Sequence, residues 1–400
     1  MFSLIESAAA SADPLTSRVY AGVFWPSLWF PDQPAPVSRA LSATAESGPP
    51  AVAGQGQPAT SPSGAQIARS LKMGYRSPAQ RTVLDALGRL IDEGTAGSAT
   101  ESEAEQRRRL EEFEALLPQL IDSSPRSPED QGEGAVLRQR AARNASAPAR
   151  GDGKAGEPDL DRGLGEDLSH LWSNAKDALR AASYYEMKGR AGDVGQNGLG
   201  PLLEQLHRQS PQTRVHLIGH SFGARLVAYA LAGISGPETS PVASLTLIQA
   251  AFSHWAFAAN TPFDSAGGVS GYADRVHGPL VSTYSRYDWA VGRWYPRASL
   301  LFRDDSRDLT TPPDLARWGG IGADGFQGVN TGNPPLLDTG RPYHLASGFH
   351  AVDCSGVIND VTQSTFAGAH SDIQHEQVAW LVVSAAVAGA QAATADTPHP

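Results

Sequence analysis

One segment, RVHLIGHSFGARLVAYALAG at residues 214–233, constrains the fold more than any other part of the sequence. The apolar run VHLI is typical of a buried strand, and ARLVAYALAG is typical of a helix. Only the turn GHSFG separates them, so small residues are needed where strand and helix approach each other. The small residues there are Gly219, Gly223 and Ala224. The segment therefore predicts a strand, a tight turn that holds Ser221, and a helix.

Three further segments have the signature of strands, which is a short β-branched or aromatic run between turn residues. They are Val19–Trp25, Ala243–Gln249 and Leu280–Tyr284, with Ala351–Ile358 as a weaker candidate. Their apolarity is continuous, as in strands buried on both faces of a parallel sheet. Helical patterns lie at Asp167–Lys188, Leu199–Arg208, Gly223–Ala232 and Asp372–Ala386. This alternation predicts an α/β fold, with a mostly parallel sheet flanked by helices.

Residues 31–158 differ in composition from the rest of the chain. Long runs rich in Pro, Ser, Ala and Gly, which are typical of disordered linkers, border two helical patterns. One helix is predicted to begin at Pro78, after Ser77, and the other at the capping box of Ser102 and Glu105. We expect a long, partly disordered insertion with a helical hairpin. The predicted domains are residues 1–30 and 159–400 for the α/β core, and 31–158 for the insertion.

Composition excludes several classes of function. The net charge of −10 argues against non-specific binding to nucleic acid. The single cysteine, Cys354, leaves no disulfide within the chain and no cysteine-based metal cage. No signal-peptide pattern, phosphate loop or dinucleotide fingerprint is present, and the longest apolar run is shorter than the ~18–20 residues of a membrane span. We therefore expect no cofactor, no nucleic-acid partner, no transmembrane segment and a cytoplasmic location.

The turn GHSFG, with its flanking strand and helix, resembles the nucleophile elbow of lipases and esterases in the α/β-hydrolase superfamily. The resemblance implies that Ser221 is a nucleophile and that the backbone N–H of Phe222 is an oxyanion donor. A plain glycine-rich turn is the alternative interpretation.

A serine nucleophile needs a base, and the base needs a carboxylate that orients it. In the superfamily the chain order is serine, acid, histidine. The resemblance therefore implies Asp288, after the strand Leu280–Tyr284, as the acid and His370, before the last helix, as the base. Asp353 and His375 are the alternatives for these two roles.

The remaining histidines and acids allow other interpretations. His216, inside a strand, and His220, beside the serine, are interpreted as structural. A metal site is the alternative use of the C-terminal loop, but its residue spacing matches no standard ligand motif, so no metal is predicted. The ligands of that alternative site would be His370, Asp372, His375, Asp304 and Asp305.

The sequence departs from the superfamily at its beginning. The family's second oxyanion donor follows an earlier strand, commonly with a His-Gly pair, and nothing here matches it. Val19–Trp25 resembles the strand after that one, FWPS resembles a segment of some bacterial α/β-hydrolases, and SLIESAAASA resembles the end of the helix between them. We expect an N-terminally incomplete core, with a rebuilt sheet as the alternative. Loss of one oxyanion donor typically costs about 10²–10³ in kcat.

The resemblance implies a serine hydrolase that cleaves a carboxylic ester or thioester through a Ser-His-Asp triad and an acyl-enzyme. The expected substrate is a small-molecule or lipid-like acyl compound. Aromatic residues near 252–263 fit either an apolar acyl pocket or simple packing of a loop. A non-catalytic hydrolase-like scaffold and a peptidase of the same fold are the alternatives. The aromatic residues are Phe252, Trp255, Phe257 and Phe263.

Overall fold

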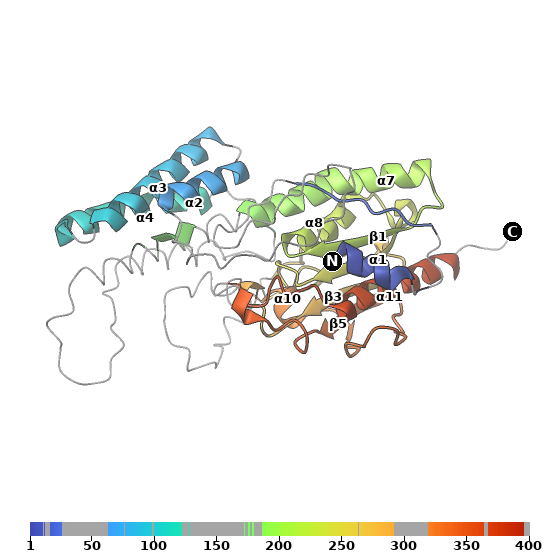
Figure 1. Cartoon of the computed structure of the whole chain (residues 1–400). Helices are drawn as coiled ribbons and strands as arrows, with labels where there is room; N and C mark the ends of the chain where they lie inside the picture. The colour runs from blue at the N-terminus through green and yellow to red at the C-terminus, as the bar shows by residue number, and fades with distance from the viewer. Residues whose placement is uncertain are drawn as a thin grey trace, which may run out of the picture. The chain divides into compact units, whose positions relative to one another are not determined.

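The structure is a computed structural model, and Figure 1 draws the whole chain. It describes residues 1–10, 12, 17–25, 63–75, 77–97, 100–121, 127, 172, 175–176, 178–179, 186–262, 264–291, 319–363 and 367–395. The chain divides into two compact units: Met1–Trp25 with Ile121–Ala147 and Tyr184–Pro400, and Pro26–Leu120 with Pro148–Ser183. The second unit overlaps the predicted insertion, whose nature as an insertion stays a prediction.

A parallel five-stranded sheet lies at the centre of the first unit. The strands are β1 (Val215–His220), β2 (Val242–Ile248), β3 (Pro279–Tyr284), β4 (Thr331–Gly332) and β5 (Gly348–Asp353). They lie in the order β1-β2-β3-β5-β4, and every neighbouring pair is parallel. The predicted α/β class with a mostly parallel sheet is therefore confirmed.

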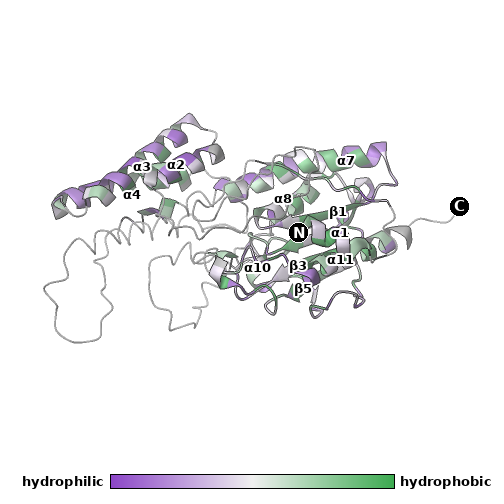
Figure 2. Ribbon diagram, viewed as in Figure 1, coloured by the Kyte–Doolittle hydropathy of each residue, from purple (hydrophilic) through white to green (hydrophobic). Residues whose placement is uncertain are grey.

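Helices cover both faces of this sheet (Figure 1). One face packs against α7 (Gly200–Gln209) and α8 (Phe222–Ala230), and the other against α1 (Phe2–Ala10) and α11 (Glu376–Ala395). Successive strand residues alternate between the two cores, as Leu247 and Ile248 do on β2. All seven residues of β2 are buried, which explains its unbroken apolar sequence. Figure 2 shows β1, α8 and α11 as predominantly hydrophobic.

The shorter helices of the first unit connect these elements. They are η3 (Gly195–Leu199, a π-helix), η4 (Leu231–Gly233), η5 (Pro237–Thr239), η6 (Ala273–Arg275), α10 (Ile321–Asp324) and η9 (Val361–Gln363). Across the described residues, every helix falls short of the length and apolarity needed to cross a bilayer.

The prediction of a strand at Val19–Trp25 is wrong. These residues are described without strand pairing, and the side chains of Val19 and Phe24 are 92% and 96% exposed. Strand-prone side chains need a neighbouring strand and a buried face. Among the described residues this segment pairs with no strand, and only its last residue, Trp25, is half-buried. The weaker candidate at 351–358 is a strand that begins and ends earlier, as β5, and the predicted helix at the N-terminus is present as α1.

The last helix begins later than its predicted start at Asp372. The carbonyl of His375 accepts a hydrogen bond from the Ala379 N–H, so His375 occupies the N-cap position and α11 starts at Glu376. The Asp372 carboxylate instead accepts from the backbone amides of Asn359 and Asp360. The loop-binding role of Asp372 prevents it from capping the helix.

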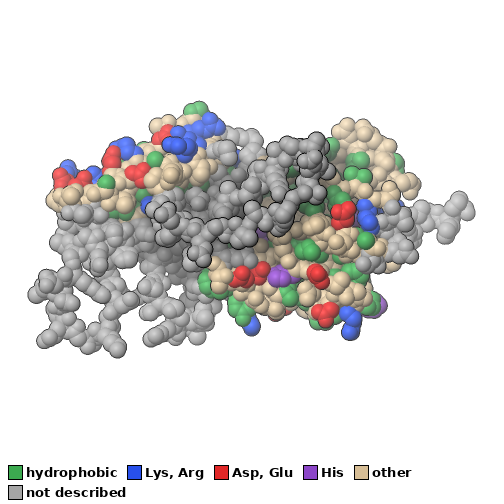
Figure 3. Space-filling model, viewed as in Figure 1, with side chains coloured by type: hydrophobic (Ala, Val, Ile, Leu, Met, Phe, Trp, Pro, Cys, Tyr) green, Lys and Arg blue, Asp and Glu red, His purple; other side chains and the backbone are tan. Residues whose placement is uncertain are grey.

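Among the described residues, the second unit includes the helices α2 (Gly64–Leu71), α3 (Pro78–Gly97) and α4 (Glu103–Ile121), with the turn η1 (Lys72–Gly74) after α2. Residues 172, 175–176 and 178–179 of the same unit are also helical. As predicted, α3 begins at Pro78, and Ser102 and Glu105 form a capping box before α4. Helix α2, capped by Ser63 and Gln66, was not predicted. Figure 2 shows many hydrophilic residues on these helices, and Figure 3 shows charged side chains on the face of this unit in view.

Candidate active site

The turn between β1 and α8 has a strained backbone. Ser221 lies between the two elements with φ 57° and ψ −125°, a conformation that costs a residue other than glycine about 1–3 kcal/mol. Hydrogen bonds hold it there: its N–H donates to the Ile248 carbonyl, and its own carbonyl accepts from the amides of Ala224 and Ala251. The backbone N–H and C=O of Ser221 are therefore fixed to the last residue of β2, to Ala251 after that strand and to the first turn of α8.

Close packing at this turn requires one of the two glycines. A Cβ atom at Gly219 would lie 2.4 Å from the Gly223 carbonyl oxygen and 2.5 Å from the Ala224 Cα. Ala224 is itself fully buried. A Cβ atom at Gly223 would meet nothing within 4 Å, so the expectation that Gly223 must be small for packing is wrong.

The structure brings together the three predicted side chains Ser221, His370 and Asp288. The His370 Nε2 atom lies 2.8 Å from the Ser221 Oγ, and the His370 Nδ1 atom lies 2.8 Å from the Asp288 Oδ2. A carboxylate only accepts hydrogen bonds, so Nδ1 carries the proton in neutral His370, and Nε2 presents its lone pair to the hydroxyl. Ser221 follows β1, Asp288 follows β3 and His370 precedes α11, so the first two lie beyond the carboxyl ends of parallel strands.

Asp288 is almost completely buried, at 1% exposure, and accepts three hydrogen bonds. Its Oδ2 atom accepts from His370 and from the Gln249 Nε2 at 2.9 Å, and its Oδ1 atom accepts from the Val291 N–H at 3.0 Å. Buried carboxylates are costly unless they are paired in this way. The three N–H donors stabilise the negative charge and fix the orientation of the carboxylate.

Gln249 is a part of this arrangement that the sequence analysis did not identify. It follows the last residue of β2, is fully buried, and has a left-handed backbone with φ 44°. The signal in the sequence is a single amide at the carboxyl end of the apolar run ASLTLIQ. A polar side chain at that end of a central strand is a candidate for the site edge.

His220, interpreted as structural, contacts the loop of His370. Its Nε2 atom lies 3.0 Å from the His370 carbonyl oxygen and therefore donates to it, and the two rings are 5.0 Å apart. Burial lowers the pKa of His220 to about 4, and the neighbouring His370 adds to the effect. His220 is therefore neutral near pH 7 and holds the loop without competing as a base.

The alternative acid and base lie in other surroundings. Asp353 is exposed, and its carboxylate accepts from the Ser355 amide at 2.8 Å. His375 pairs with Asp372 at 3.0 Å. His216 bonds to the Ser244 hydroxyl on β2, and burial lowers its pKa to about 4.

The alternative metal site has no support in the residues that the structure describes. They contain no group of three histidine, cysteine or carboxylate side chains placed to hold a metal ion. Asp304 and Asp305 lie outside the described residues.

The aromatic residues proposed for an acyl pocket lie partly in the core. Phe252 and Phe257 are buried there, and Phe257 makes edge contacts with the rings of Phe326 and Phe349. Phe263 lies outside the described residues. The contacts of Phe252 and Phe257 favour the packing interpretation for these two residues, and the pocket stays a prediction.

The oxyanion side of the site is less complete. Phe222 is the first residue of α8, where backbone N–H groups and the helix dipole favour negative charge. Within the described sheet, β1 is an edge strand that pairs only with β2. The loop from which the resemblance would take a second donor therefore has no counterpart among the described residues.

Comparison with known proteins adds no family to this picture. No protein-family model matches the chain, and neither the curated proteins nor the solved structures include a significant match. The argument for function therefore depends on the geometry of the site itself.

Proposed function

We propose that this chain is a serine hydrolase of the α/β-hydrolase type that cleaves a carboxylic ester or thioester. The observation that supports the proposal is the pair of 2.8 Å contacts linking Ser221 to His370 and His370 to Asp288. The three residues are separated by 149 and 82 positions in the sequence. Nucleophile, base and orienting acid in hydrogen-bond reach are the requirements for this chemistry.

In the proposed reaction, His370 Nε2 takes the hydroxyl proton as the Ser221 Oγ forms a bond to the acyl carbon. Asp288 stabilises the imidazolium that results, because its carboxylate accepts from Nδ1. The imidazolium then gives the proton to the departing alkoxide or thiolate as the acyl–leaving-group bond breaks. The product is an acyl-enzyme on Ser221.

Water completes the cycle by the same route. His370 removes a proton from the attacking water, the bond to Ser221 breaks, and the proton returns to the serine oxygen. In each half-reaction the negative oxygen forms beside the N-terminus of α8, where the Phe222 N–H is the proposed donor.

A fluorophosphonate probe tests the proposal, because it phosphonylates only an activated serine. We expect the full chain to be labelled, and Ser221→Ala to abolish labelling. Ser235→Ala is the matched control, since that serine lies at the surface and bonds to Glu204. Labelling that persists in Ser221→Ala would refute the assignment of the nucleophile.

The edge position of β1 in the described sheet favours a second candidate, a non-catalytic scaffold of the same fold, because one oxyanion donor lacks a counterpart among the described residues. Complete absence of labelling in the folded chain would support the scaffold. If labelling occurs, parallel assays with acyl esters, acyl thioesters and aminoacyl amides distinguish the esterase from the peptidase.

A further inference from the structure

The amide side chain of Gln249 occupies a position that its sequence alone does not explain. It lies immediately after β2, between the elbow strand β1 and the strand β3 that leads to Asp288. Its side chain is fully buried, and its backbone adopts the left-handed conformation that residues other than glycine seldom take. A buried amide at such a position needs a partner for each polar atom.

Every polar atom of this side chain has a partner. The two Nε2 protons go to the Asp288 Oδ2 at 2.9 Å and to the Gly322 carbonyl oxygen at 3.0 Å. The Oε1 atom accepts from the Thr283 hydroxyl at 3.0 Å, and the Thr283 oxygen accepts in turn from the Gln249 backbone N–H at 3.1 Å. The amide therefore has one possible orientation, because a flipped amide would point its oxygen at two acceptors.

The contact with Asp288 involves the same oxygen that binds His370. Oδ2 is shared by the His370 Nδ1 at 2.8 Å and the Gln249 Nε2 at 2.9 Å. Two donors on one oxygen compete for its charge, so the amide limits how strongly Asp288 attracts the imidazole proton. The amide is itself held by Thr283 on β3 and by Gly322 on α10. It therefore fixes the Asp288 carboxylate relative to these two elements and to the end of β2.

We infer that Gln249 is a positioning residue for the proposed reaction: it orients the Asp288 carboxylate and sets how strongly that carboxylate holds His370. The inference rests on the proposed function for its effect on rate. Its effect on the His370–Asp288 hydrogen bond does not require activity.

Two substitutions and one control test the inference. Gln249→Met keeps the length of the side chain and removes both donors. Thr283→Val removes the hydroxyl that orients the amide and leaves Gln249 in place. The control is Ser282→Ala, on the same strand, because the buried Ser282 hydroxyl has no hydrogen-bond partner among the described residues.

We expect Gln249→Met to slow fluorophosphonate labelling of Ser221 by about 10- to 100-fold, as for loss of a hydrogen bond to a charged group. The pH at which labelling is half-maximal should rise by about half a unit or more, because Asp288 with one donor fewer holds the imidazolium more tightly. Thr283→Val should shift both quantities in the same direction by less. Ser282→Ala should change neither.

The downfield proton resonance of His370 Nδ1–H provides a readout that is independent of activity. It is assigned by its disappearance in Asp288→Asn, and we expect it to move in Gln249→Met and to stay in place in Ser282→Ala. A purely structural role would lower Tm without moving the pH midpoint or this resonance. If Gln249→Met does not fold, the same two measurements on Thr283→Val decide.

Failure of the proposed function and failure of the positioning role of Gln249 give different results. Wild-type protein that is not labelled would refute the proposed function, and the resonance would still test the positioning role. Labelled wild-type protein, with a folded Gln249→Met that keeps the wild-type rate, pH midpoint and resonance, would overturn the inference and leave the proposed function intact.

Discussion

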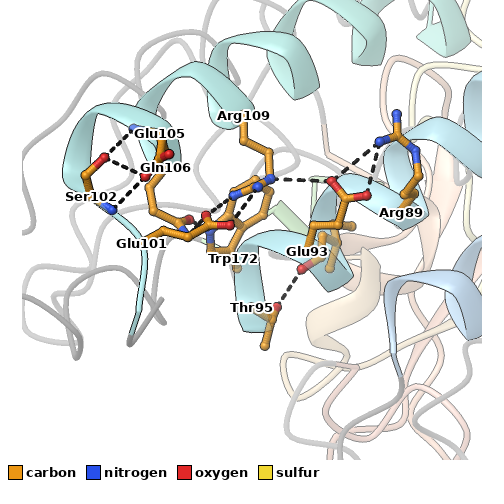
Figure 4. A network of polar contacts seen from close by, with 10 residues as sticks. Arg89, Glu93, Thr95, Glu101, Ser102, Glu105, Gln106, Arg109 and Trp172 are labelled. Carbon is orange, nitrogen blue, oxygen red and sulfur yellow. Dashed lines mark hydrogen bonds and ion pairs between the residues drawn. The ribbon is translucent and has the colours of Figure 1, made fainter. Parts of the chain in front are cut away.

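Each of the two compact units holds a network of hydrogen bonds and charged groups, and the networks differ in the origin of their members. At the sheet edge, His370 bonds to residues 149 and 82 positions away, and Gln249 to Asp288, 39 positions away. In the second unit, most partners are close in sequence, such as Arg89 and Glu93 at four positions (Figure 4). Local pairs of this kind form wherever a helix places two side chains on one face.

The two networks also differ in burial. Asp288 and Gln249 are 1% and 0% exposed, whereas the side chains of Arg89 and Glu93 are 56% and 44% exposed. Exposed pairs are screened by water and contribute little, but a buried carboxylate without its partners is costly. Polar contacts alone therefore do not indicate a site. Distant, buried groups held on a strained backbone are the informative combination.

The largest expected effect is on the buried network. Asp288→Asn replaces an acceptor with a group that presents an NH₂ to the N–H donors around it. We expect the labelling rate of Ser221 to fall by about 10³–10⁴-fold, because His370 takes the wrong tautomer. Glu101→Gln, which removes the carboxylate paired with Arg109 in the second unit, should leave the rate unchanged. Equal loss in both variants would contradict the comparison.

The next effect is a pH dependence of stability that belongs to the first unit. His216 and His220 have pKa values lowered by burial to about 4, below the usual value of 6.5. As pH falls from 6.5 to 4, the unfolded chain binds protons that the folded unit does not. The stability that comes from these lowered pKa values should therefore be fully present above pH 6.5. Below that pH, the free energy of unfolding should fall by up to about 1.4 kcal/mol for each pH unit and each histidine.

Urea unfolding between pH 7.5 and 5 measures this slope. His216→Gln keeps a polar group near Ser244 and removes one titrating site, so it should reduce the slope by about half. A slope unchanged by that substitution would place the titration elsewhere.

The two glycines of the turn between β1 and α8 are expected to respond differently to substitution. Gly219→Ala places a methyl group 2.4 Å from a backbone oxygen, and such overpacking typically costs about 1–3 kcal/mol. Gly223→Ala adds a methyl group in open space on α8, where alanine is favoured over glycine by about 0.5–1 kcal/mol. Thermal unfolding of the two variants should give Tm shifts of opposite sign. A similar loss in both would contradict the packing derived for this turn.

Local patterns predicted much of the fold. The run VHLI, the glycines and the helix after them correctly gave β1, the turn and α8, and Ser102 with Glu105 gave the start of α4. The strand predicted at Val19–Trp25 failed because strand propensity is realised only against a partner. Helix α2 was missed because its cap, Ser63, follows a long run rich in Pro, Ser and Gly.

The candidate site was predictable only in part. Ser221 is identifiable from its own neighbours, whereas Asp288 and His370 were chosen through the order of residues in the superfamily, and their role stays a proposal. For Gln249 the only local signal is an amide at the end of an apolar run, and its contacts do not follow from that signal, because they depend on the register of β2 against β3 and on the position of α10. Contacts of that kind are set by tertiary packing and do not appear in a single sequence.

A smaller effect is expected at a buried contact of the second network. The Gln106 Oε1 accepts from the Trp172 indole N–H at 2.7 Å, and the two residues are 2% and 1% exposed. Gln106→Leu leaves this buried donor without a partner, at a typical cost of about 1–3 kcal/mol. Urea unfolding should show the loss, and labelling of Ser221 should not change. A neutral result would mean that this contact behaves like the exposed pairs around it.

The smallest effect is expected at the exposed end of the same network. Arg89 contacts Glu93 at 3.1 Å and Glu112 at 3.8 Å, and all three side chains are more than a third exposed. Arg89→Gln should change the free energy of unfolding by about 0.5 kcal/mol or less at low salt, and high salt should abolish the difference. The part of the loss in Gln106→Leu that comes from the Trp172 contact should persist at high salt, because that contact is buried and uncharged. Salt dependence thus separates screened pairs from buried ones, and an Arg89→Gln effect that resisted salt would show that exposure does not govern the strength of these contacts.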